Sequence, residues 1–244
     1  MISKELHINN KPSKKDLFTI KRWLEKEIEE TGEGFYVNWE VIEKVFNKNN
    51  LITLNYKNTP IGFVTFYKSE IHVEIGIFAI NPKYRRKGIG KIFFEKIAEY
   101  FLLQNFLALK LFCSPANSEI FWKKMGFIEY PNIGYSEHRL TYYKPIIEVQ
   151  QSSTDERHNN KLELWDCEPY QKDNQKPTWA WDLDMDSNSP TLPIIQPCND
   201  NWNLRWRKNG EVNQEVKVKY FKSNRKVIHF PPFLYIPPKY TSIH

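Results

Sequence analysis

Apolar residues near the start of the chain recur with the spacing of helices. Between Lys14 and Glu30 they return every three or four positions, and Ser13 stands just before them as a helix N-cap. A second run of this kind extends from Asn38 to Asn47. The two runs predict two amphipathic helices, each with one face packed against a core.

The following residues have strand character. Three runs rich in β-branched and aromatic residues cover Leu51–Tyr56, Ile61–Tyr67 and Ile71–Ile80. The connections between them are short, which favours antiparallel pairing of successive strands. We therefore expect an antiparallel meander of three strands.

Helix and strand patterns then alternate up to residue 130. Apolar residues again recur with helical spacing after Gly88, and a β-branched or aromatic run follows each helical stretch. The predicted elements are a helix at Gly88–Leu103, a strand at Leu107–Cys113, a short helix at Asn117–Met125 and a strand at Phe127–Tyr130.

The C-terminal third lacks helical periodicity. Apolar and polar residues alternate from Trp202 to Trp206 and again from Val216 to Tyr220, with an Asn209-Gly210 turn between them. This pattern predicts a half-buried β-hairpin. Two proline pairs near the C-terminus keep the chain there extended and non-helical.

Composition changes near residue 150. Eight of the nine glycines precede this point, whereas nine of the fifteen prolines and five of the eight tryptophans follow it. Residues 150–160 contain no apolar side chain, so they can bury nothing and indicate a linker or a long exposed loop. We therefore expect one domain over residues 1–148, a linker over 149–160 and a β-rich domain over 161–244.

Overall composition narrows the class of protein. A chain of 244 residues, 41% of them hydrophobic, can bury a core or two, and its net charge of +6 is too small to distinguish nucleic-acid binding from a basic pocket. No apolar run approaches the roughly 20 residues of a membrane span, and the N-terminus is too polar for a secretory signal. Three widely spaced cysteines indicate neither a disulfide framework nor a metal site. A cytoplasmic protein without membrane contact is expected.

The segment with the clearest chemistry precedes the helix predicted at Gly88. Four cationic residues and two glycines stand between Arg85 and Lys91, and the helix begins among them. Free backbone amides and the positive end of the helix dipole attract anions at such a position. Because glycine also permits close approach of the backbone, the segment predicts a site for phosphate or pyrophosphate.

The spacing of these residues fits neither a Walker loop nor a dinucleotide-binding fingerprint. The run Arg85-Arg86-Lys87-Gly88-Ile89-Gly90 instead resembles the acyl-CoA loop of the GCN5-related N-acetyltransferase (GNAT) superfamily, Arg/Gln-x-x-Gly-x-Gly/Ala. The run from Trp122 to Phe127 looks like the family's aromatic-x-x-x-Gly-Phe ending, and the order of predicted elements matches the family's fold. The resemblance covers about residues 1–145 and does not reach the C-terminal region.

This resemblance implies an α+β fold, with a mixed central sheet and helices on both faces, followed by the β-rich second domain. It also implies acetyl-CoA as co-substrate, with no metal. In the family, the fourth strand pairs with the pantetheine arm where the fourth and fifth strands splay apart, and the glycine loop holds the pyrophosphate. The residues implied are Phe78, Ala79 and Ile80 for pantetheine, Arg85, Arg86, Lys87, Gly88, Ile89, Gly90 and Lys91 for pyrophosphate, and Asn117 for a further cofactor contact.

Glu74 is the catalytic base that the resemblance implies. It lies four residues before Phe78, where several members carry a glutamate that deprotonates the attacking amine. Amine attack on a thioester requires a neutral amine, so a part-buried carboxylate suits this role. A solvated strand glutamate is an equally good interpretation. The rival bases are Glu70, Glu33, His72 and His138.

Trp122 stands where many members have a tyrosine that returns a proton to the leaving thiolate. An indole N–H is far too weak an acid for this step. Either solvent assists the thiolate, or another residue replaces the tyrosine. The candidates are Tyr84, Tyr130, Tyr135 and Cys113.

Charge in the C-terminal region is polarised. Residues 155–186 hold nine acidic and four basic residues, whereas residues 187–244 hold three acidic and nine basic ones. The basic side chains of the predicted hairpin could bind a phosphate backbone, pair with the acidic segment of the same region, or remain solvated. These side chains are Arg205, Arg207, Lys217 and Lys219.

The sequence thus predicts an enzyme that transfers an acetyl group from acetyl-CoA to a primary amine by direct attack in a ternary complex. A small polyamine or aminoglycoside acceptor would require an acidic cleft, whereas a protein or aminoacyl-tRNA would fit a basic hairpin. The C-terminal domain would shape the acceptor site, contact a partner or form a homodimer. The alternative is a non-catalytic module on the same scaffold that binds CoA, nucleic acid or protein.

Overall fold

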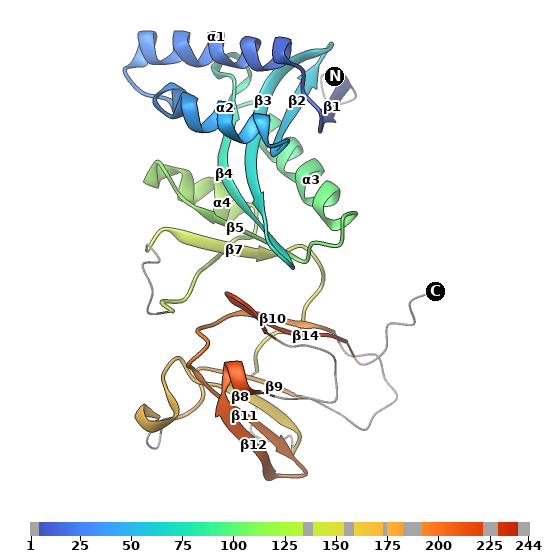
Figure 1. Ribbon diagram of the computed structural model, residues 1–244, viewed down its shortest axis with the longest axis vertical. Coiled ribbons are helices and arrows are strands. Elements are labelled where there is room, and N and C mark those ends of the chain that lie inside the picture. The colour runs from blue at the N-terminus through green and yellow to red at the C-terminus, as the bar shows by residue number, and fades with distance from the viewer. Residues whose placement is uncertain are drawn as a thin grey trace. The chain divides into compact units, whose positions relative to one another are not determined.

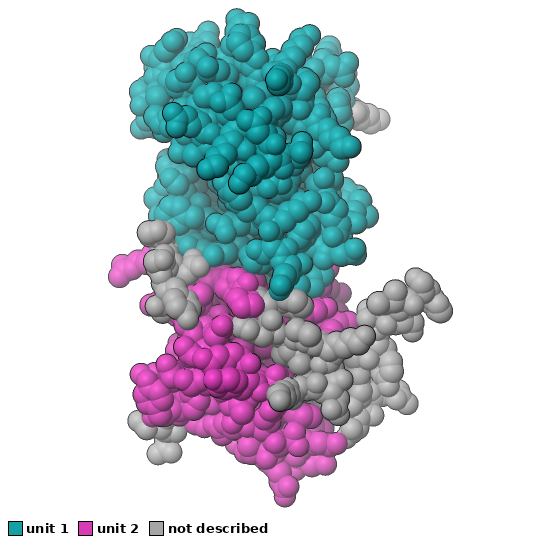
Figure 2. Space-filling view, in the orientation of Figure 1, with its two compact units in different colours: residues 1–129, 140–146 teal, residues 130–139, 147–244 magenta. Residues whose placement is uncertain are grey.

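The computed structural model describes residues 5–133, 139–153, 159–172, 175–182, 192–221 and 229–238. The chain forms two compact units, residues 1–129 with 140–146 and residues 130–139 with 147–244 (Figure 2). The second unit therefore includes a short segment that leaves the first unit and returns to it. The domain and linker boundaries expected from the sequence stay a prediction.

Unit 1 is built on a mixed sheet whose described strands follow the order β1-β2-β3-β4-β5-β7-β6 (Figure 1). All neighbours are antiparallel except β4 and β5, which are parallel. The expected antiparallel meander of three strands is confirmed and corresponds to β2, β3 and β4. The strands are β1 (Leu6–Asn9), β2 (Leu51–Tyr56), β3 (Thr59–Lys68), β4 (His72–Ile80), β5 (Ala108–Phe112), β6 (Ile128–Glu129) and β7 (Thr141–Pro145).

The predicted helices of unit 1 are confirmed to within a few residues. Helix α1 begins at a capping box, in which Ser13 Oγ accepts a hydrogen bond from the Asp16 amide at 3.2 Å, and it ends at Gly32 in the left-handed conformation. The α-helices are α1 (Lys14–Thr31), α2 (Trp39–Asn47), α3 (Ile89–Leu102) and α4 (Glu119–Lys124), and the 3₁₀ turns are η2 (Phe35–Asn38), η3 (Pro82–Tyr84) and η4 (Ala116–Ser118).

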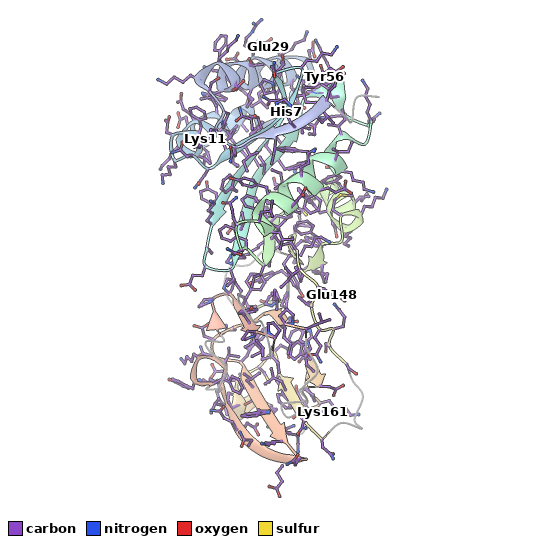
Figure 3. The ribbon with its side chains drawn as sticks, turned by 90° about the vertical axis from the view of Figure 1, so that its right-hand side faces the viewer. His7, Lys11, Glu29, Tyr56, Glu148 and Lys161 are labelled. Carbon is purple, nitrogen blue, oxygen red and sulfur yellow. The ribbon has the colours of Figure 1, made fainter. Side chains whose placement is uncertain are left out.

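Helices cover both faces of the sheet (Figure 1). Helices α1 and α2 pack on one face, where Leu24 and Ile42 meet Phe63 and Ala79. Helices α3 and α4 pack on the other face, in a core that includes Phe93. The expected fold class, a mixed sheet between helices, is confirmed. Two short strands, β1 and β7, were not expected. Strand β1 lies at the sheet edge beside β2, and Figure 3 labels one residue of each, His7 and Tyr56.

Strand β4 changes its pairing halfway along. Its first half pairs with β5, from His72 opposite Ala108 to Ile75 opposite Leu111. From Gly76 onward, the described residues of β5 no longer pair with β4, while β3 continues beside it. Strands β4 and β5 therefore diverge, and the second half of β4 keeps one free edge.

A β-bulge accompanies this divergence. Two steps along β3, from Val64 to Phe66, correspond to three steps along β4, from Phe78 to Ile75, so β4 contains one extra residue. The extra residue reverses the alternation of side chains. Ile75 and Phe78 both face the α3 side, whereas Glu74 faces the α1 side.

The described part of unit 2 contains strands and 3₁₀ turns and no α-helix. Its sheets have the orders β12-β11-β8-β9 and β10-β14-β13. The elements are β8 (Lys161–Leu164), η5 (Pro169–Gln171), β9 (Trp179–Asp182), β10 (Ile194–Pro197), β11 (Asn203–Lys208), β12 (Glu211–Lys217), η6 (Val218–Tyr220), β13 (His229–Phe230) and β14 (Phe233–Ile236).

The predicted hairpin corresponds to β11 and β12. Asn209 and Gly210 both have positive φ, at 52° and 82°, as a tight two-residue hairpin turn requires. The expected second strand over Val216–Tyr220 was wrong in its bounds, because β12 starts directly after the turn and gives way to η6 at Val218. None of the helices that the structure describes is long and apolar enough to cross a membrane.

Candidate functional site

A cleft of about 1050 Å³ lies in unit 1 beside the free half of β4. Three segments that are distant in sequence form its walls: the end of α1 with the turn after it, the end of β4 with the loop to α3 and the first residues of α3, and α4 with the turn before it. Nine of the residues predicted for the cofactor line it. They are Phe78, Ala79, Ile80, Arg85, Arg86, Gly88, Gly90, Lys91 and Asn117.

Aromatic rings support the β4 side of the cleft. The Phe78 ring lies 4.9 Å from that of Phe93 in α3 and 5.3 Å from that of Trp122 in α4, measured between centroids. Trp122 also contacts Phe94 and Phe127 and is 6% exposed. Trp122 therefore fixes α4 to the sheet, which explains why a large ring suits this position.

The loop between β4 and α3 has the backbone geometry of an anion site. Arg86 and Gly88 have positive φ, at 58° and 74°, whereas Arg85 has a φ of −66°. Alternation of left-handed and ordinary residues makes successive amides converge. Open space surrounds Gly88, since an added Cβ there would meet nothing within 4 Å. The backbone N–H groups in the first turn of α3 have no intrahelical partner, so they add to the positive potential at this end of the helix.

Arg85 is engaged by the protein itself. Its Nε donates to the Ile80 carbonyl at 2.7 Å, and its Nη1 lies 2.5 Å from Glu27 Oε1. Arg85 thus fastens the loop to the end of β4 and to α1. Its expected contact with pyrophosphate stays a prediction, and these contacts favour a structural role instead.

Two other predicted loop residues do not line the cleft. Lys87 Nζ donates to the Lys83 carbonyl at 2.8 Å, and Ile89 is 3% exposed within the core. The Ile89 side chain therefore cannot contact an anion, whereas the exposed Lys87 ammonium has used one of its three donors on a carbonyl. Lys91 lines the cleft and lies 3.8 Å from Glu95 on the exposed side of α3.

Glu74 does not line the cleft. It is exposed rather than part-buried, and its strand neighbours are Tyr67 on β3 and Lys110 on β5. The bulge in β4 turns it to the face opposite Phe78. Its role as base stays a prediction.

The rival bases occupy different environments. His72 is buried, and burial together with the Lys110 charge lowers its pKa to about 4, so it is neutral at pH 7. Glu70 is exposed on the turn before β4, and Glu33 lines the cleft. His138 lies outside the described residues.

None of the candidate acids that the structure describes lines the cleft. Tyr84 packs on Tyr56, with ring centroids 6.3 Å apart, and the Tyr130 hydroxyl, in unit 2, donates to the Pro232 carbonyl at 3.3 Å. Cys113 is buried, which raises the pKa of its thiol. Tyr135 lies outside the described residues.

Glu27 is a cleft residue that the sequence reasoning missed. It is 7% exposed and lies on the buried face of α1. Ile20, Leu24 and Glu27 have the spacing i, i+4 and i+7, so its place on the apolar stripe was readable. A carboxylate at a core position is the signal that could have found it.

The basic hairpin of unit 2 pairs with acidic residues of the same unit. Arg205 Nε and Arg207 Nε lie 2.6 Å and 3.1 Å from Glu163 Oε2, and Lys217 Nζ lies 2.6 Å from Glu168 Oε2. Both carboxylates belong to the acidic segment 155–186. Of the three interpretations of the hairpin, internal pairing is therefore borne out for these three residues. In the described part of the chain, no group of three His, Cys, Asp or Glu side chains could hold a metal ion.

Most of unit 1 matches a known protein family. Residues 15–127 match the model of the acetyltransferase (GNAT) family. Similar solved structures include Ard1 from Thermoplasma volcanium, which is 23% identical, covers 59% of this chain and 99% of its own, and has a TM-score of 0.46. Another is the PaiA N-acetyltransferase from Thermoplasma acidophilum in complex with coenzyme A. It is 18% identical, covers 57% of this chain and 98% of its own, and has a TM-score of 0.46.

GCN5 from Tetrahymena is also similar, with 18% identity, coverage of 58% of this chain and 96% of its own, and a TM-score of 0.45. No curated protein sequence matches the chain. The family model spans α1 to the end of α4 and so includes every segment that lines the cleft. The chain therefore contains a domain of the acetyltransferase (GNAT) family at residues 15–127.

Proposed function

We propose that the protein is an acyl-CoA-dependent N-acyltransferase that moves an acetyl group from acetyl-CoA to a primary amine. The observation that carries this proposal is that one cleft joins the free edge of β4 to the glycine loop before α3. A CoA thioester has an amide-bearing arm and a pyrophosphate. A free strand edge suits the amides of the arm, and converging backbone amides suit the phosphates.

In this proposal the backbone of Phe78, Ala79 and Ile80 pairs with the pantetheine arm. The backbone from Arg86 to Lys91 holds the pyrophosphate, and the side chains of Arg86 and Lys91 add positive charge. Asn117 contributes a polar group from the opposite wall. Arg85 has a structural role, because its contacts with Ile80 and Glu27 fix the loop that holds these groups.

The reaction requires two proton movements. The lone pair of a neutral amine attacks the thioester carbonyl carbon, a C–N bond forms, and the C–S bond then breaks. The amine loses one proton and the thiolate gains one. We propose direct attack in a ternary complex, with Glu74 removing the proton through water, since Glu74 is exposed and outside the cleft wall.

We propose that solvent returns the proton to the thiolate. The described residues that line the cleft include no tyrosine, and Trp122 holds the position at which the family often has one. The same observation favours the second candidate function, a module that binds CoA without catalysis. The two candidates share the cofactor site and differ in turnover.

Isothermal titration calorimetry of the full chain with acetyl-CoA tests the shared site. Release of CoA is then measured against a panel of small amines, N-terminal peptides and charged tRNA. We expect saturable binding of acetyl-CoA and amine-dependent release of CoA. Binding without turnover of any acceptor would favour the non-catalytic module, and absence of binding would refute both candidates.

A further inference from the structure

Lys124 is a cation of the cleft that the proposed function leaves without a role. It is exposed in the last turn of α4 and lines the cleft together with Phe121 and Met125. Within the described part of the chain it makes no salt bridge, whereas its neighbour Lys123 pairs with Glu119 at 2.6 Å. The charge of Lys124 is therefore free to meet a ligand in the cleft.

Helix α4 turns one defined face toward the cleft. Phe121, Lys124 and Met125 have the spacing i, i+3 and i+4, so their side chains lie on the same side of the helix. Lys123 lies on another side, where its Nζ is 5.7 Å from the centroid of the Tyr142 ring, and it does not line the cleft. The cleft face of α4 thus combines one cation with two apolar side chains.

This face adjoins the loop that is proposed to hold the pyrophosphate. A Cβ added to Gly90 would lie 3.4 Å from Phe121 Cε2, so the Phe121 ring packs against the backbone at the start of α3. The same ring stacks on that of Phe78, with centroids 5.9 Å apart. A ligand that extends beyond the glycine loop can therefore pass directly onto α4.

The opposite wall of the cleft is less suited to a further anion. The described residues that α1 and the turn after it contribute to the wall include no lysine or arginine, and their charged side chains are Glu27 and Glu33. Arg85 reaches this wall, but it is paired there with Glu27 at 2.5 Å. An additional phosphate would be repelled by the exposed Glu33 and attracted by Lys124.

We infer that the cleft face of α4 binds the adenosine end of CoA, with Lys124 pairing with its 3′-phosphate. Beyond the pyrophosphate, CoA consists of an adenosine whose ribose carries this third phosphate. Lysine binds phosphate as a point charge, and Phe121 and Met125 supply apolar contacts for the adenosine. The inference rests on the proposed function and adds a selectivity to it: the protein distinguishes CoA from 3′-dephospho-CoA.

Calorimetry of the full chain with CoA and with 3′-dephospho-CoA tests this inference, because the two compounds differ only in that phosphate. Lys124→Gln removes the charge and keeps a long side chain with good helix propensity. Lys124→Arg keeps the charge. Lys123→Gln is the matched control, since it removes the same charge from the same helix at a position that does not line the cleft.

We expect the parent to bind CoA about fivefold or more tightly than 3′-dephospho-CoA, a modest preference because the pair is exposed to solvent. Added salt should reduce this preference. Lys124→Gln should weaken CoA binding until the preference is lost, while its affinity for 3′-dephospho-CoA stays within about twofold of that of the parent. Lys124→Arg and Lys123→Gln should both keep the preference.

Equal affinity of the parent for the two compounds would overturn the inference. A preference that persists in Lys124→Gln would place the 3′-phosphate elsewhere, and an equal loss of affinity for both compounds would reduce Lys124 to a general charge effect; either result would also overturn it. Failure of the parent to bind either compound would refute the proposed function itself.

Discussion

Arg86 combines a positive charge with a left-handed backbone in the loop before α3. Arg86→Asn removes the charge but keeps a residue that tolerates a φ of 58°. We expect the Kd for CoA to rise about tenfold, because a charge-assisted contact with phosphate is lost. Calorimetry measures this change.

Lys83→Asn provides the control, because Lys83 is an exposed cation in η3 that does not line the cleft. Its Kd for CoA should stay close to that of the parent. An equal loss of affinity in both variants would mean that only overall charge matters, and it would contradict a specific role for Arg86.

Glu74 can be tested by pH dependence. If it takes the proton of the amine, Glu74→Gln should lower kcat about 10²-fold or more throughout the pH–rate profile. Glu70→Gln, which alters another exposed carboxylate on the turn before β4, should keep the profile of the parent. Equal rates for Glu74→Gln and the parent between about pH 6 and 9 would exclude Glu74 as base.

His72 links folding stability to pH. Its pKa is lowered to about 4 by burial and by Lys110, so the unfolded chain binds the proton more readily than the folded one. Stability from this group is complete above about pH 6.5 and is lost as pH falls toward 4, by up to about 1.4 kcal/mol per pH unit.

Chemical denaturation across this pH range should show that His72→Gln flattens the dependence. His7→Gln, at an exposed position on β1, serves as the control and should retain the slope of the parent. An unchanged slope in His72→Gln would assign the acid sensitivity to other groups.

At the scale of elements, one carboxylate on β8 adds side-chain pairing to the backbone pairing between β8 and β11. Glu163 is 8% exposed and pairs with Arg205 and Arg207, so its replacement by glutamine removes the negative charge that the two guanidinium groups share. We expect Glu163→Gln to destabilise the protein by about 2 kcal/mol or more. Glu211→Gln, an exposed change on β12, should cost little, as thermal denaturation would show. Equal melting temperatures for the two variants would contradict this role.

The sequence allowed most elements of unit 1 to be predicted because their signals are local. Apolar spacing located α1 and α3, and β-branched runs located β2 to β4. The strands β1 and β7 were missed because each is short and depends on a distant partner for its pairing. The 3₁₀ turn at Val218 breaks an alternation that looked like a strand, so tertiary packing overrode the local pattern there.

The candidate site was predictable where it depends on the backbone. Glycines and a helix start located the anion loop from residue types alone. The bulge in β4 left no comparable signal, and it decides that Glu74 and Phe78 lie on opposite faces. Arg85 has the charge of a phosphate ligand, and only the position of Glu27 shows that this charge is used inside the protein.

At the scale of the whole molecule, later parts of unit 2 supply hydrogen-bond partners to Tyr130 and Ile133. Tyr130 and Ile133 are 6% and 3% exposed. The Tyr130 hydroxyl donates to the Pro232 carbonyl, and the Ile133 carbonyl accepts from the Asn199 side-chain amide. A chain that ends at Val149 would lose these partners while it keeps every residue that lines the cleft. We expect it to aggregate more readily, as size-exclusion chromatography would show, and to retain CoA binding in its monomeric fraction.

A monodisperse truncated chain with the thermal stability of the parent would contradict this prediction. Loss of CoA binding from a folded truncated monomer would show that the cleft also depends on unit 2. Neither result would alter the assignment of residues 15–127 to the family.

The passage of residues 130–139 into unit 2 has a consequence for synthesis on the ribosome. Unit 1 has all of its strands once residue 146 has emerged, yet Asn199 and Pro232, which contact this segment, are made later. Since domains begin to fold as they emerge, Tyr130 and Ile133 must wait uncovered during that interval. The nascent chain therefore has a period in which chaperones can recognise this segment. That period ends only when β14 has left the exit tunnel.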